Sequence, residues 1–319
     1  MSEREMNCRR WALAVISGGL LGLSVTIVGS TVDTATSTTA ASTAITSTGT
    51  PTESVPSLRP HRSDGEESSS TPPPEPPKQL VVGHGFDDVG VMVYDQARAV
   101  VALEHNAHEQ FTSASLVKLL IAFDALEQGA PPSDVHTMIA ESHDQLAGQF
   151  WVHGGRPDLV TRWAERLGLE NTEAPELPNM WGDTLTTAAD TVKVYRYLLY
   201  EAPPKTRDVV LSALRDSTPH GTDGFYQHFG IPDAAGELPF AVKQGWACCT
   251  DERVLHTTGL VGDDDRYIVA VLTRTSRGVD YQTVSERLTA YVEQVLTATG
   301  VDHDSSLPER TPVRDPHRG

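Results

Sequence analysis

The stretch that decides the fold runs from residue 111 to residue 120 and reads Phe-Thr-Ser-Ala-Ser-Leu-Val-Lys-Leu-Leu. Apolar residues recur at helical spacing from Leu116 to Leu126 and predict a helix that faces a core. Ser115 and Lys118 are three residues apart, so a helix places them on one face, one turn from each other. A serine hydroxyl becomes a strong nucleophile only beside a base, and a lysine amine can serve when burial and a helix start lower its pKa.

A Ser-x-x-Lys spacing can also arise by chance on a surface helix, and two observations weigh against that interpretation here. The chain has only five lysines (residues 78, 118, 193, 205 and 243), so its positive surface is built mainly from arginine. Lys118 also stands between Val117 and Leu119 in an apolar stretch, where an unpaired charge is costly. We therefore take Ser115 and Lys118 as the first candidate site residues.

The elements expected around this stretch indicate an α+β domain. Alternating apolar residues at 89–94 and 99–104, separated by a polar turn, predict a hairpin. The middle of the chain is helical in character, and it is followed by three strand candidates and a last amphipathic helix. Helices inserted between the strands of one antiparallel sheet give a sheet layer and a helical lobe with a cleft between them. The expected helices are 144–151, 157–167, 186–200, 206–214 and 281–296, and the later strands are 240–246, 254–261 and 267–273.

Two further motifs follow in order. Residues 138–147 (Met-Ile-Ala-Glu-Ser-His-Asp-Gln-Leu-Ala) contain Ser142 and Asp144, and residues 241–246 (Ala-Val-Lys-Gln-Gly-Trp) contain Lys243 at the start of the strand group. With Ser115 and Lys118, this order resembles the signature of class A β-lactamases and penicillin-binding proteins, the serine D,D-peptidases. Residues 182–190 are similar to a stretch that follows the active-site loop in those enzymes, and the resemblance spans about 89–297. It implies a five-stranded antiparallel sheet with a helical lobe and an active site in the cleft between.

The resemblance also implies a role for each matching position. Ser115 would attack a carbonyl carbon, Lys118 would take or relay its proton, Ser142 would carry a proton to the leaving nitrogen, and Lys243 would attract a substrate carboxylate. The backbone amides of Ser115 and Trp246 would form the oxyanion hole. The remaining residues expected to contact substrate are Asp144, Gln244 and Gly245. The resemblance implies no metal and no organic cofactor, and its substrate would be a small molecule or peptide, either a β-lactam or a D-alanyl peptide.

The chain departs from the family pattern at two of these positions. Asp144 stands where the family has Asn, and an ionised Asp would hold Lys118 charged and weaken it as a base. Gln244 stands where the family has Thr, which removes one hydroxyl from the substrate pocket. The distance from Lys118 to Ser142 along the chain is also shorter than in class A enzymes. An alternative interpretation of Ser142 and Asp144 is a helix N-cap, because both residue types cap helices well.

Release of an acyl group is the step that the sequence supports least. Class A enzymes activate the hydrolytic water with a loop glutamate, and here Glu173 and Glu176 lie in a suggestive but disturbed spacing. The alternative interpretation of each is a solvated loop carboxylate. We therefore expect inefficient deacylation, and we carry two alternatives: a catalytically weak or inactive module that binds cell-wall peptide, and an esterase of the same fold.

The ends of the chain predict export. Arg9 and Arg10 precede the uncharged run 11–29, so residues 1–30 are a cleaved signal peptide or an uncleaved membrane anchor. Residues 31–85 are rich in Thr, Ser and Pro and predict a disordered stalk, and 301–319 predict a disordered tail. The catalytic domain would then occupy 86–300 and face the cell wall.

The net charge limits the classes of partner that we expect, and the cysteine positions limit the disulfides. The formal net charge is −18 and no basic cluster stands out, which argues against nucleic acid and against docking on anionic lipid. We expect membrane contact only through the N-terminal segment, and a monomer. Cys8 precedes the apolar run, while Cys248 and Cys249 are adjacent and form either a strained disulfide or two buried apolar side chains. His256 is expected to pack in the core.

Overall fold

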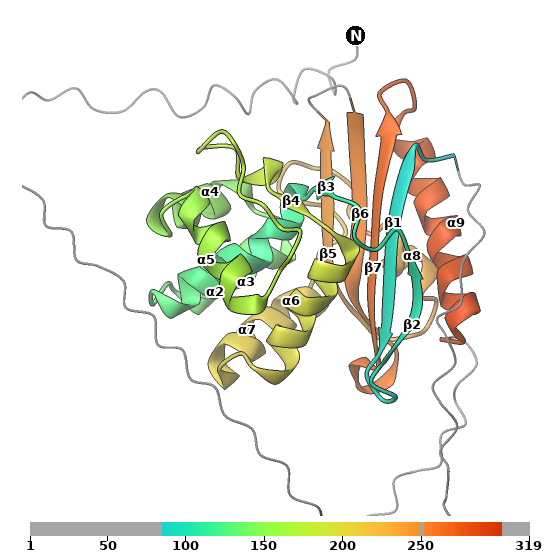
Figure 1. Cartoon of the computed structure of the whole chain (residues 1–319), viewed down its shortest axis with the longest axis horizontal. Coiled ribbons are helices and arrows are strands. Elements are labelled where there is room, and N and C mark those ends of the chain that lie inside the picture. Colours follow the sequence, from blue (N-terminus) through green and yellow to red (C-terminus); the bar gives the residue numbers. More distant parts are fainter. Residues whose placement is uncertain (1–84, 249–251, 302–319) are drawn as a thin grey trace, which may run out of the picture. The chain divides into compact units, whose positions relative to one another are not determined.

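The computed structural model describes residues 85–248 and 252–301, and its centre is a five-stranded antiparallel sheet (Figure 1). The order of strands across the sheet is β2-β1-β7-β6-β5, so the first hairpin and the last three strands form one layer. This confirms the predicted α+β class and the predicted five-stranded sheet. The strands are β1 (Asp88–Asp95), β2 (Val100–His105), β5 (Phe240–Cys248), β6 (Glu252–Val261) and β7 (Tyr267–Ser276).

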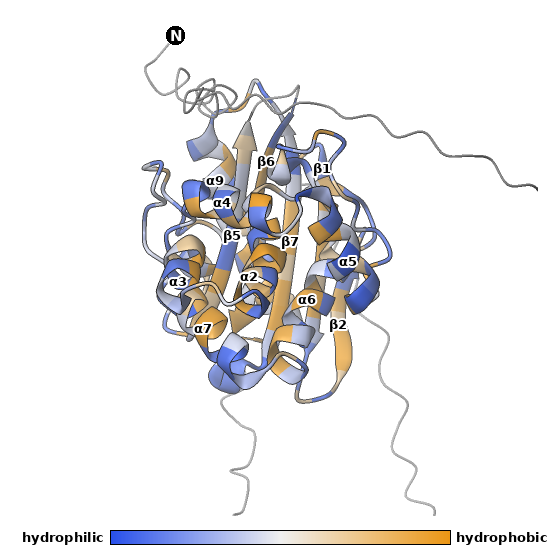
Figure 2. Ribbon diagram, turned by 90° about the vertical axis from the view of Figure 1, so that its left-hand side faces the viewer, coloured by the Kyte–Doolittle hydropathy of each residue, from blue (hydrophilic) through white to orange (hydrophobic). Residues whose placement is uncertain are grey.

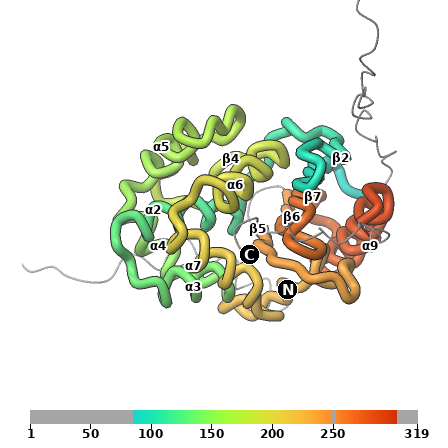
Figure 3. Tube along the Cα trace, turned by 90° about the horizontal axis from the view of Figure 1, so that it is seen from below, coloured from blue at the N-terminus to red at the C-terminus, as the bar shows by residue number. Residues whose placement is uncertain are grey.

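Helices cover both faces of the sheet (Figures 1 and 3). The larger group lies on the face opposite α9, and in Figure 2 α2 stands in the middle of that group. Each helix expected from the sequence is present, with shifts of a few residues at the ends. The larger group contains α2 (Lys118–Glu127), α3 (Pro132–Ala140), α4 (Asp144–His153), α5 (Pro157–Leu167), α6 (Ala188–Tyr200) and α7 (Pro204–Arg215), and the other face carries α8 (Ile231–Ala234) and α9 (Tyr281–Thr299).

Two departures from the expected elements concern the surroundings of Ser115. Helix α3 was not anticipated, although its proline at the first helical position favours a helix start. The expected helix 186–200 begins two residues later, because residues 185–186 pair with β3 (Phe111–Thr112) as the short strand β4 (Leu185–Thr186). Thr187 then caps α6 by accepting a hydrogen bond from the backbone N–H of Asp190, at 3.0 Å.

The core has two layers, one on each face of the sheet. On the central strand β7, Ile268, Ala270 and Leu272 pack under the larger helical group, whereas Val269 and Val271 pack under α9. This alternation follows from the two-residue period of a strand. Because both faces of β7 are covered, every residue from 267 to 273 is buried. The edge strands of the sheet are therefore connected through a buried central strand.

Several predictions fall outside the described residues. They are the signal or anchor segment at 1–30, all but the last residue of the stalk, all but the first residue of the tail, and the bonding of Cys248 and Cys249. Within residues 85–248 and 252–301, the helices are all too short or too polar to cross a bilayer. The boundaries proposed for the folded domain stay a prediction.

Candidate active site

The amine of Lys118 is the centre of the candidate site. Its Nζ lies 2.9 Å from the Oγ of Ser115, 3.0 Å from the Oγ of Ser142 and 2.9 Å from the backbone oxygen of Ser142. It also forms an ion pair and hydrogen bond with the Oδ1 of Asp144. The side chain is fully buried, so these oxygens take the place of water around the amine. The pair that the sequence placed on one helical face is therefore in hydrogen-bond contact.

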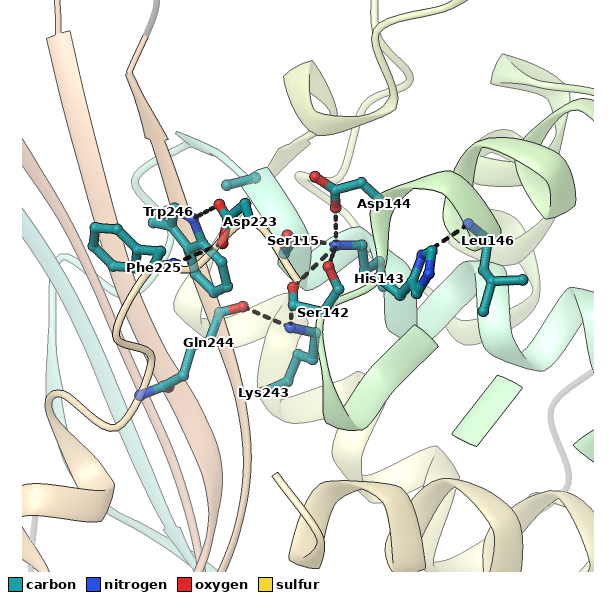
Figure 4. Close-up of polar contacts among 12 residues, drawn as sticks. Ser115, Ser142, His143, Asp144, Leu146, Asp223, Phe225, Lys243, Gln244 and Trp246 are labelled. Atoms are coloured by element: carbon teal, nitrogen blue, oxygen red, sulfur yellow. Dashed lines mark hydrogen bonds and ion pairs between the residues drawn. The ribbon is translucent and has the colours of Figure 1, made fainter. Parts of the chain in front are cut away.

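The hydroxyl of Ser142 joins the two lysines. Its Oγ lies 3.0 Å from the Nζ of Lys118 and 3.0 Å from the Nζ of Lys243, and Lys243 also donates to the backbone oxygen of Gln244 at 2.9 Å. Lys243 comes from β5 at the edge of the sheet, whereas Ser142 lies between α3 and α4. The structure thus brings together Ser115, Lys118, Ser142 and Lys243 at the junction of the sheet and the helices (Figure 4).

Two residues near Lys118 have a left-handed backbone although neither is glycine. Ala114 has φ 47° immediately before Ser115, and Ser142 has φ 51°. An L-residue in this conformation costs about 1–2 kcal/mol because its Cβ approaches the backbone carbonyl. Such residues persist where the surrounding structure holds them, and they concentrate at functional sites. Here one of them precedes Ser115 and the other is Ser142, the two residues whose hydroxyl groups contact the amine of Lys118.

Gly245 allows the edge strand β5 to approach the segment that carries Ser115. A Cβ at this position would lie 3.0 Å from the backbone oxygen of Ser113 and 3.2 Å from the Cγ of Leu116. Such a contact is tighter than nearly all real Cβ contacts, so a larger residue here would push the two segments apart by a few tenths of an ångström, and glycine favours this spacing. Gly245 was expected to contact substrate. In the structure it also lets β5 pack closely against the 3₁₀ turn η2 (Ala114–Val117).

His256 holds the same segment from the neighbouring strand β6. Its Nε2 lies 2.8 Å from the backbone oxygen of Thr112, and its Nδ1 lies 3.1 Å from the backbone N–H of Thr273. The N–H of Thr273 can only donate, so Nδ1 accepts and Nε2 carries the proton. Burial lowers the pKa of His256 to about 4, which keeps the ring neutral. The prediction that His256 packs in the core is confirmed.

Burial also lowers the pKa of both site lysines. For Lys118 the desolvation by burial is opposed by the carboxylates of Asp144 and Asp223, so its pKa ends below the ordinary value. For Lys243 the burial is reinforced by the neighbouring charge of Lys118, and its pKa lies well below the ordinary value. Keeping two adjacent buried amines charged at once costs much free energy. One of them is therefore neutral and can accept a proton.

The side chain of Gln244 does not join this group. Its Nε2 donates to the backbone oxygen of Phe229, and its Oε1 is buried with no hydrogen-bond partner in the described structure. Strand alternation explains the difference, because Lys243 and Gln244 are consecutive and point to opposite faces of β5. Only the backbone oxygen of Gln244 reaches the site, where it accepts from Lys243.

In the described part of the chain, no hydrogen bond or ion pair joins the loop glutamates to the residues around Lys118. The Oε1 of Glu173 accepts a hydrogen bond from the Nε2 of Gln110 at 2.8 Å, and the backbone of Glu173 bridges to Leu185. Both Glu173 and Glu176 are exposed. The sequence suggested that one of them activates water near Ser115, and that role stays a prediction to which the structure adds no contact.

The interpretation of Ser142 and Asp144 as a helix cap needs a correction. Helix α4 does begin at Asp144, but its N-cap residue is His143, whose Nδ1 accepts from the backbone N–H of Leu146 at 3.4 Å. Ser142 and Asp144 instead direct their side chains to Lys118 (Figure 4). The capping residue of α4 is therefore separate from the polar groups of the site.

Two residues near the lysines were not anticipated from the sequence. The ring of Trp181 lies over Lys118, with Nζ 4.9 Å from the ring centroid. Asp223 accepts a hydrogen bond from the indole Nε1 of Trp246 at 2.9 Å. Trp181 lies in the short 3₁₀ turn η3 (Trp181–Asp183) and Asp223 in a loop, and neither segment is long enough for periodicity to give a signal.

Comparison with curated proteins finds relatives but no described activity. No family model matches the chain. Proteins named "Putative lipoprotein LppW" from Mycobacterium tuberculosis and Mycobacterium bovis are 38% identical over 188 residues, which is 54% of this chain. The chain spans 60% of the length of these relatives.

Comparison with solved structures concerns the fold. An ancestral class A β-lactamase superposes with a TM-score of 0.54 at 18% identity, over 67% of this chain and 95% of the other. A class A β-lactamase representative from Bacteroides cellulosilyticus gives 0.55 at 12% identity, over 66% and 91%. A structure of PBP-A gives 0.54 at 20% identity, over 66% and 89%. The chain therefore has the α+β fold of class A β-lactamases and PBP-A, as its motifs led us to expect.

Proposed function

We propose that this protein is an extracytoplasmic serine hydrolase that forms an acyl-enzyme on Ser115. The observation that supports this most strongly is the unbroken set of hydrogen bonds from Ser115 through Lys118 and Ser142 to Lys243. These four side chains come from three separate parts of the chain, and all are buried. A surface coincidence of Ser-x-x-Lys does not produce such a group.

The chemistry follows from the contacts. With Lys118 neutral, its Nζ accepts the proton of Ser115 as the Oγ attacks a substrate carbonyl carbon. The hydroxyl of Ser142 can accept a proton from one amine and pass its own to the leaving nitrogen, which departs as the acyl bond to Ser115 remains. The charge on the carbonyl oxygen would be held by the backbone N–H groups of Ser115 and Trp246.

The substrate class is carried over from the fold and the motifs. It is a β-lactam or a D-alanyl peptide, met outside the membrane. The predicted export segment at 1–30 supports this location, and so does the name of the mycobacterial relatives, which describes a lipoprotein. We propose slow release of the acyl group, because Glu173 contacts Gln110 and Glu176 is exposed.

One observation favours a second candidate function, a module that binds cell-wall peptide without turning it over. The carboxylate of Asp144 is in direct contact with the Nζ of Lys118 and opposes the lowering of its pKa. If this ion pair holds Lys118 charged in the native protein, Ser115 has no base. The fold and the arrangement of these side chains would remain, but the covalent step would be lost.

Covalent labelling separates the two functions. The native protein is incubated with a fluorescent penicillin and analysed on a denaturing gel, beside Ser115→Ala and the exposed-serine control Ser133→Ala. We expect labelling of the native protein and of Ser133→Ala but not of Ser115→Ala. Absence of labelling in all three, together with peptidoglycan binding that survives Ser115→Ala, would establish the binding module. Equal labelling of Ser115→Ala would remove Ser115 as the nucleophile.

The rate of release is measured in the same preparation. Intact mass spectrometry follows the acyl adduct after excess penicillin is removed, and a chromogenic cephalosporin reports turnover. We expect an adduct that persists through the assay and little turnover. Hydrolysis of nitrophenyl esters that is abolished in Lys118→Ala, without any penicillin adduct, would instead identify an esterase of the same fold.

A further inference from the structure

Ser142 occupies the position just beyond the end of helix α3. Its backbone N–H donates to the oxygen of Ile139 at 3.4 Å. The backbone N–H of His143 donates to the oxygen of Met138 at 3.1 Å. A helix that ends with these two bonds needs a left-handed residue at the position of Ser142, where glycine is the usual residue. Ser142 has φ 51°, so the chain accepts a cost in free energy here and keeps a hydroxyl that contacts both site lysines.

The last two carbonyl groups before Ser142 are bonded from another part of the chain. The oxygen of Ala140 accepts from the backbone N–H of Thr218 at 3.1 Å. The oxygen of Glu141 accepts from the backbone N–H of Thr222 at 3.0 Å. Carbonyl groups at the end of a helix have no partner within the helix, so bonds from outside fix the place of that end. The loop between α7 and α8 therefore holds the segment that leads into Ser142.

The side chain of Gln227 joins this loop to the end of α3. Its Nε2 donates to the backbone oxygen of Ala140 at 3.0 Å and to the backbone oxygen of Thr218 at 2.8 Å. A primary amide has two N–H groups, so both of them are used. Gln227 is 1% exposed, and water therefore cannot take the place of its amide. One buried amide thus connects the loop to the helix end two residues before Ser142.

The same loop also contacts Trp246 on β5. The Oδ2 of Asp223 accepts from the indole N–H of Trp246 at 2.9 Å, and the ring of Phe225 stacks on the indole with centroids 5.0 Å apart (Figure 4). A Cβ on Gly221 would lie 3.0 Å from the indole, so the loop is closely fitted around the ring. The loop that Gln227 anchors therefore contacts both the segment of Ser142 and the strand that carries the proposed oxyanion N–H of Trp246.

We infer, on the basis of the proposed function, that Gln227 is a positioning residue for Ser142. Its amide holds the end of α3, so that the Oγ of Ser142 stays 3.0 Å from the Nζ of Lys118 and 3.0 Å from the Nζ of Lys243. In the proposed reaction Ser142 passes its proton to the leaving nitrogen as the C–N bond breaks, and it takes a proton from the amine of Lys118 in return. A leaving group that departs as a stable anion does not need this proton. Gln227 therefore serves the release of nitrogen.

Two acylating agents that differ in the leaving group test the inference. A fluorescent penicillin releases a nitrogen, and a nitrophenyl ester of an N-acyl-D-alanine releases nitrophenolate. Adduct mass and the first-turnover burst of nitrophenolate give the two acylation rates. We expect Gln227→Leu to slow the penicillin at least about tenfold and the ester less than about threefold, because a general acid acts only where a proton must be delivered. An equal loss with both agents overturns the inference, since damage to the fold or to the N–H of Trp246 would slow both.

The matched control is Gln96→Leu. The amide of Gln96 also donates to a backbone oxygen, that of Asp265, in the turn between β6 and β7. This variant should leave both acylation rates unchanged. If Gln227→Leu does not fold, Thr218→Val replaces it, because the Oγ1 of Thr218 lies 3.1 Å from the Nε2 of Gln227 and 3.3 Å from the oxygen of Ala140. It should slow the penicillin at least about threefold and leave the ester unchanged. Without that selective loss, the inference fails.

A double variant shows whether Gln227 acts through Ser142. Ser142→Ala removes the proton carrier, so adding Gln227→Leu to it should not slow acylation by the penicillin further. Losses that multiply in the double variant would place the action of Gln227 elsewhere and overturn the inference, while the serine hydrolase would stand.

The outcomes also separate the inference from the proposed function. If the native protein forms no adduct on Ser115 with either agent, the proposed function fails. The anchoring of the helix end is then measured by amide hydrogen exchange at Thr218 and Thr222, whose N–H groups bond to the oxygens of Ala140 and Glu141. Faster exchange at these two amides in Gln227→Leu, but not in Gln96→Leu, is the expected result. Unchanged exchange overturns the inference.

Discussion

The group around Lys118 and the loop at 173–179 differ in how firmly the fold holds their polar side chains. Around Lys118, every proposed catalytic group is buried and has hydrogen-bond partners on other elements. In the loop, both glutamates are exposed, and Glu173 interacts with Gln110 instead of the site. The groups needed to form an acyl-enzyme are thus assembled by the core, whereas those expected to release it are not.

The proposed formation of an acyl-enzyme and its proposed hydrolysis therefore depend on groups that the fold holds differently. Desolvation strengthens an electrostatic contact and lowers the pKa of an amine, so the buried group can be prepared for proton transfer before substrate arrives. An exposed carboxylate keeps most of its contact with water, so its charge is screened. The predictions below test each side of this difference.

The largest effect is expected from removing the amine of Lys118. Lys118→Ala should slow acylation of Ser115 by fluorescent penicillin at least about 1000-fold, because a positioned general base contributes about 10²- to 10⁴-fold. The exposed-lysine control Lys205→Ala should label at the wild-type rate. Circular dichroism checks that both variants fold. A decrease of less than tenfold in a folded Lys118→Ala would show that another group takes the proton.

The next effect concerns the stability of the segment that holds Ser115. The folded-state pKa of His256 is about 4 and its ordinary value is 6.5, so the unfolded chain binds the extra proton first as the pH falls. The stability contributed by neutral His256 is complete above pH 6.5 and is lost as the pH falls through 4. The loss amounts to about 3 kcal/mol. Urea unfolding between pH 4 and 7 measures this loss as a fall in the free energy of unfolding. The dependence of that free energy on pH should be weaker in His256→Gln. An unchanged slope would contradict the role assigned to the ring.

A smaller effect is expected from Asp144. Its carboxylate raises the pKa of Lys118, so Asp144→Asn lowers that pKa further and leaves more of the amine neutral. A base must be neutral to act, and the rising limb of the pH–rate profile should therefore move to lower pH. We expect about tenfold faster acylation at pH 7, measured by adduct mass. Asp216→Asn, at an exposed carboxylate on His136, is the control. Slower acylation at every pH would mean that the carboxylate itself is required.

The smallest effect belongs to the loop. The double variant Glu173→Gln and Glu176→Gln should change the lifetime of the acyl adduct by less than about twofold, because Glu173 contacts Gln110 and Glu176 is exposed. Mass spectrometry after removal of the acylating agent gives the lifetime. An increase of tenfold or more would show that one of these carboxylates activates water, and the contrast between the two regions would then disappear on substrate binding.

Most of the fold could be predicted from the sequence, because its elements have clear periodicity. The apolar positions at 116–123 and the run 267–273 are buried as expected, Leu126 is partly buried, and the hairpin 89–104 pairs as β1 and β2. Helix α3 was missed because its polar start and its overlap with the second motif obscured the pattern. Boundaries near β3 and β4 were missed because two-residue strands have no period to detect.

The site could be predicted in part for a similar reason. Ser115 and Lys118 are near in sequence, so helical spacing alone places them together, and the order of motifs added Ser142 and Lys243. The sequence did not show that Gln244 points away from Lys243, although strand alternation implies it once β5 is known. It gave no sign of Asp223, because a contact between a loop carboxylate and an indole depends on the path of the loop through space.

The position of Gly245 on an edge strand has one more consequence. A slip of β5 by a single residue relative to β6 would exchange its two faces, turning Lys243 away from Ser142 and bringing the bulk of a side chain against Ser113. Misaligned pairing would therefore be rejected by simple crowding. Gly245 therefore lets β5 lie close to the segment of Ser115, and it also favours a single alignment of β5 with β6 during folding.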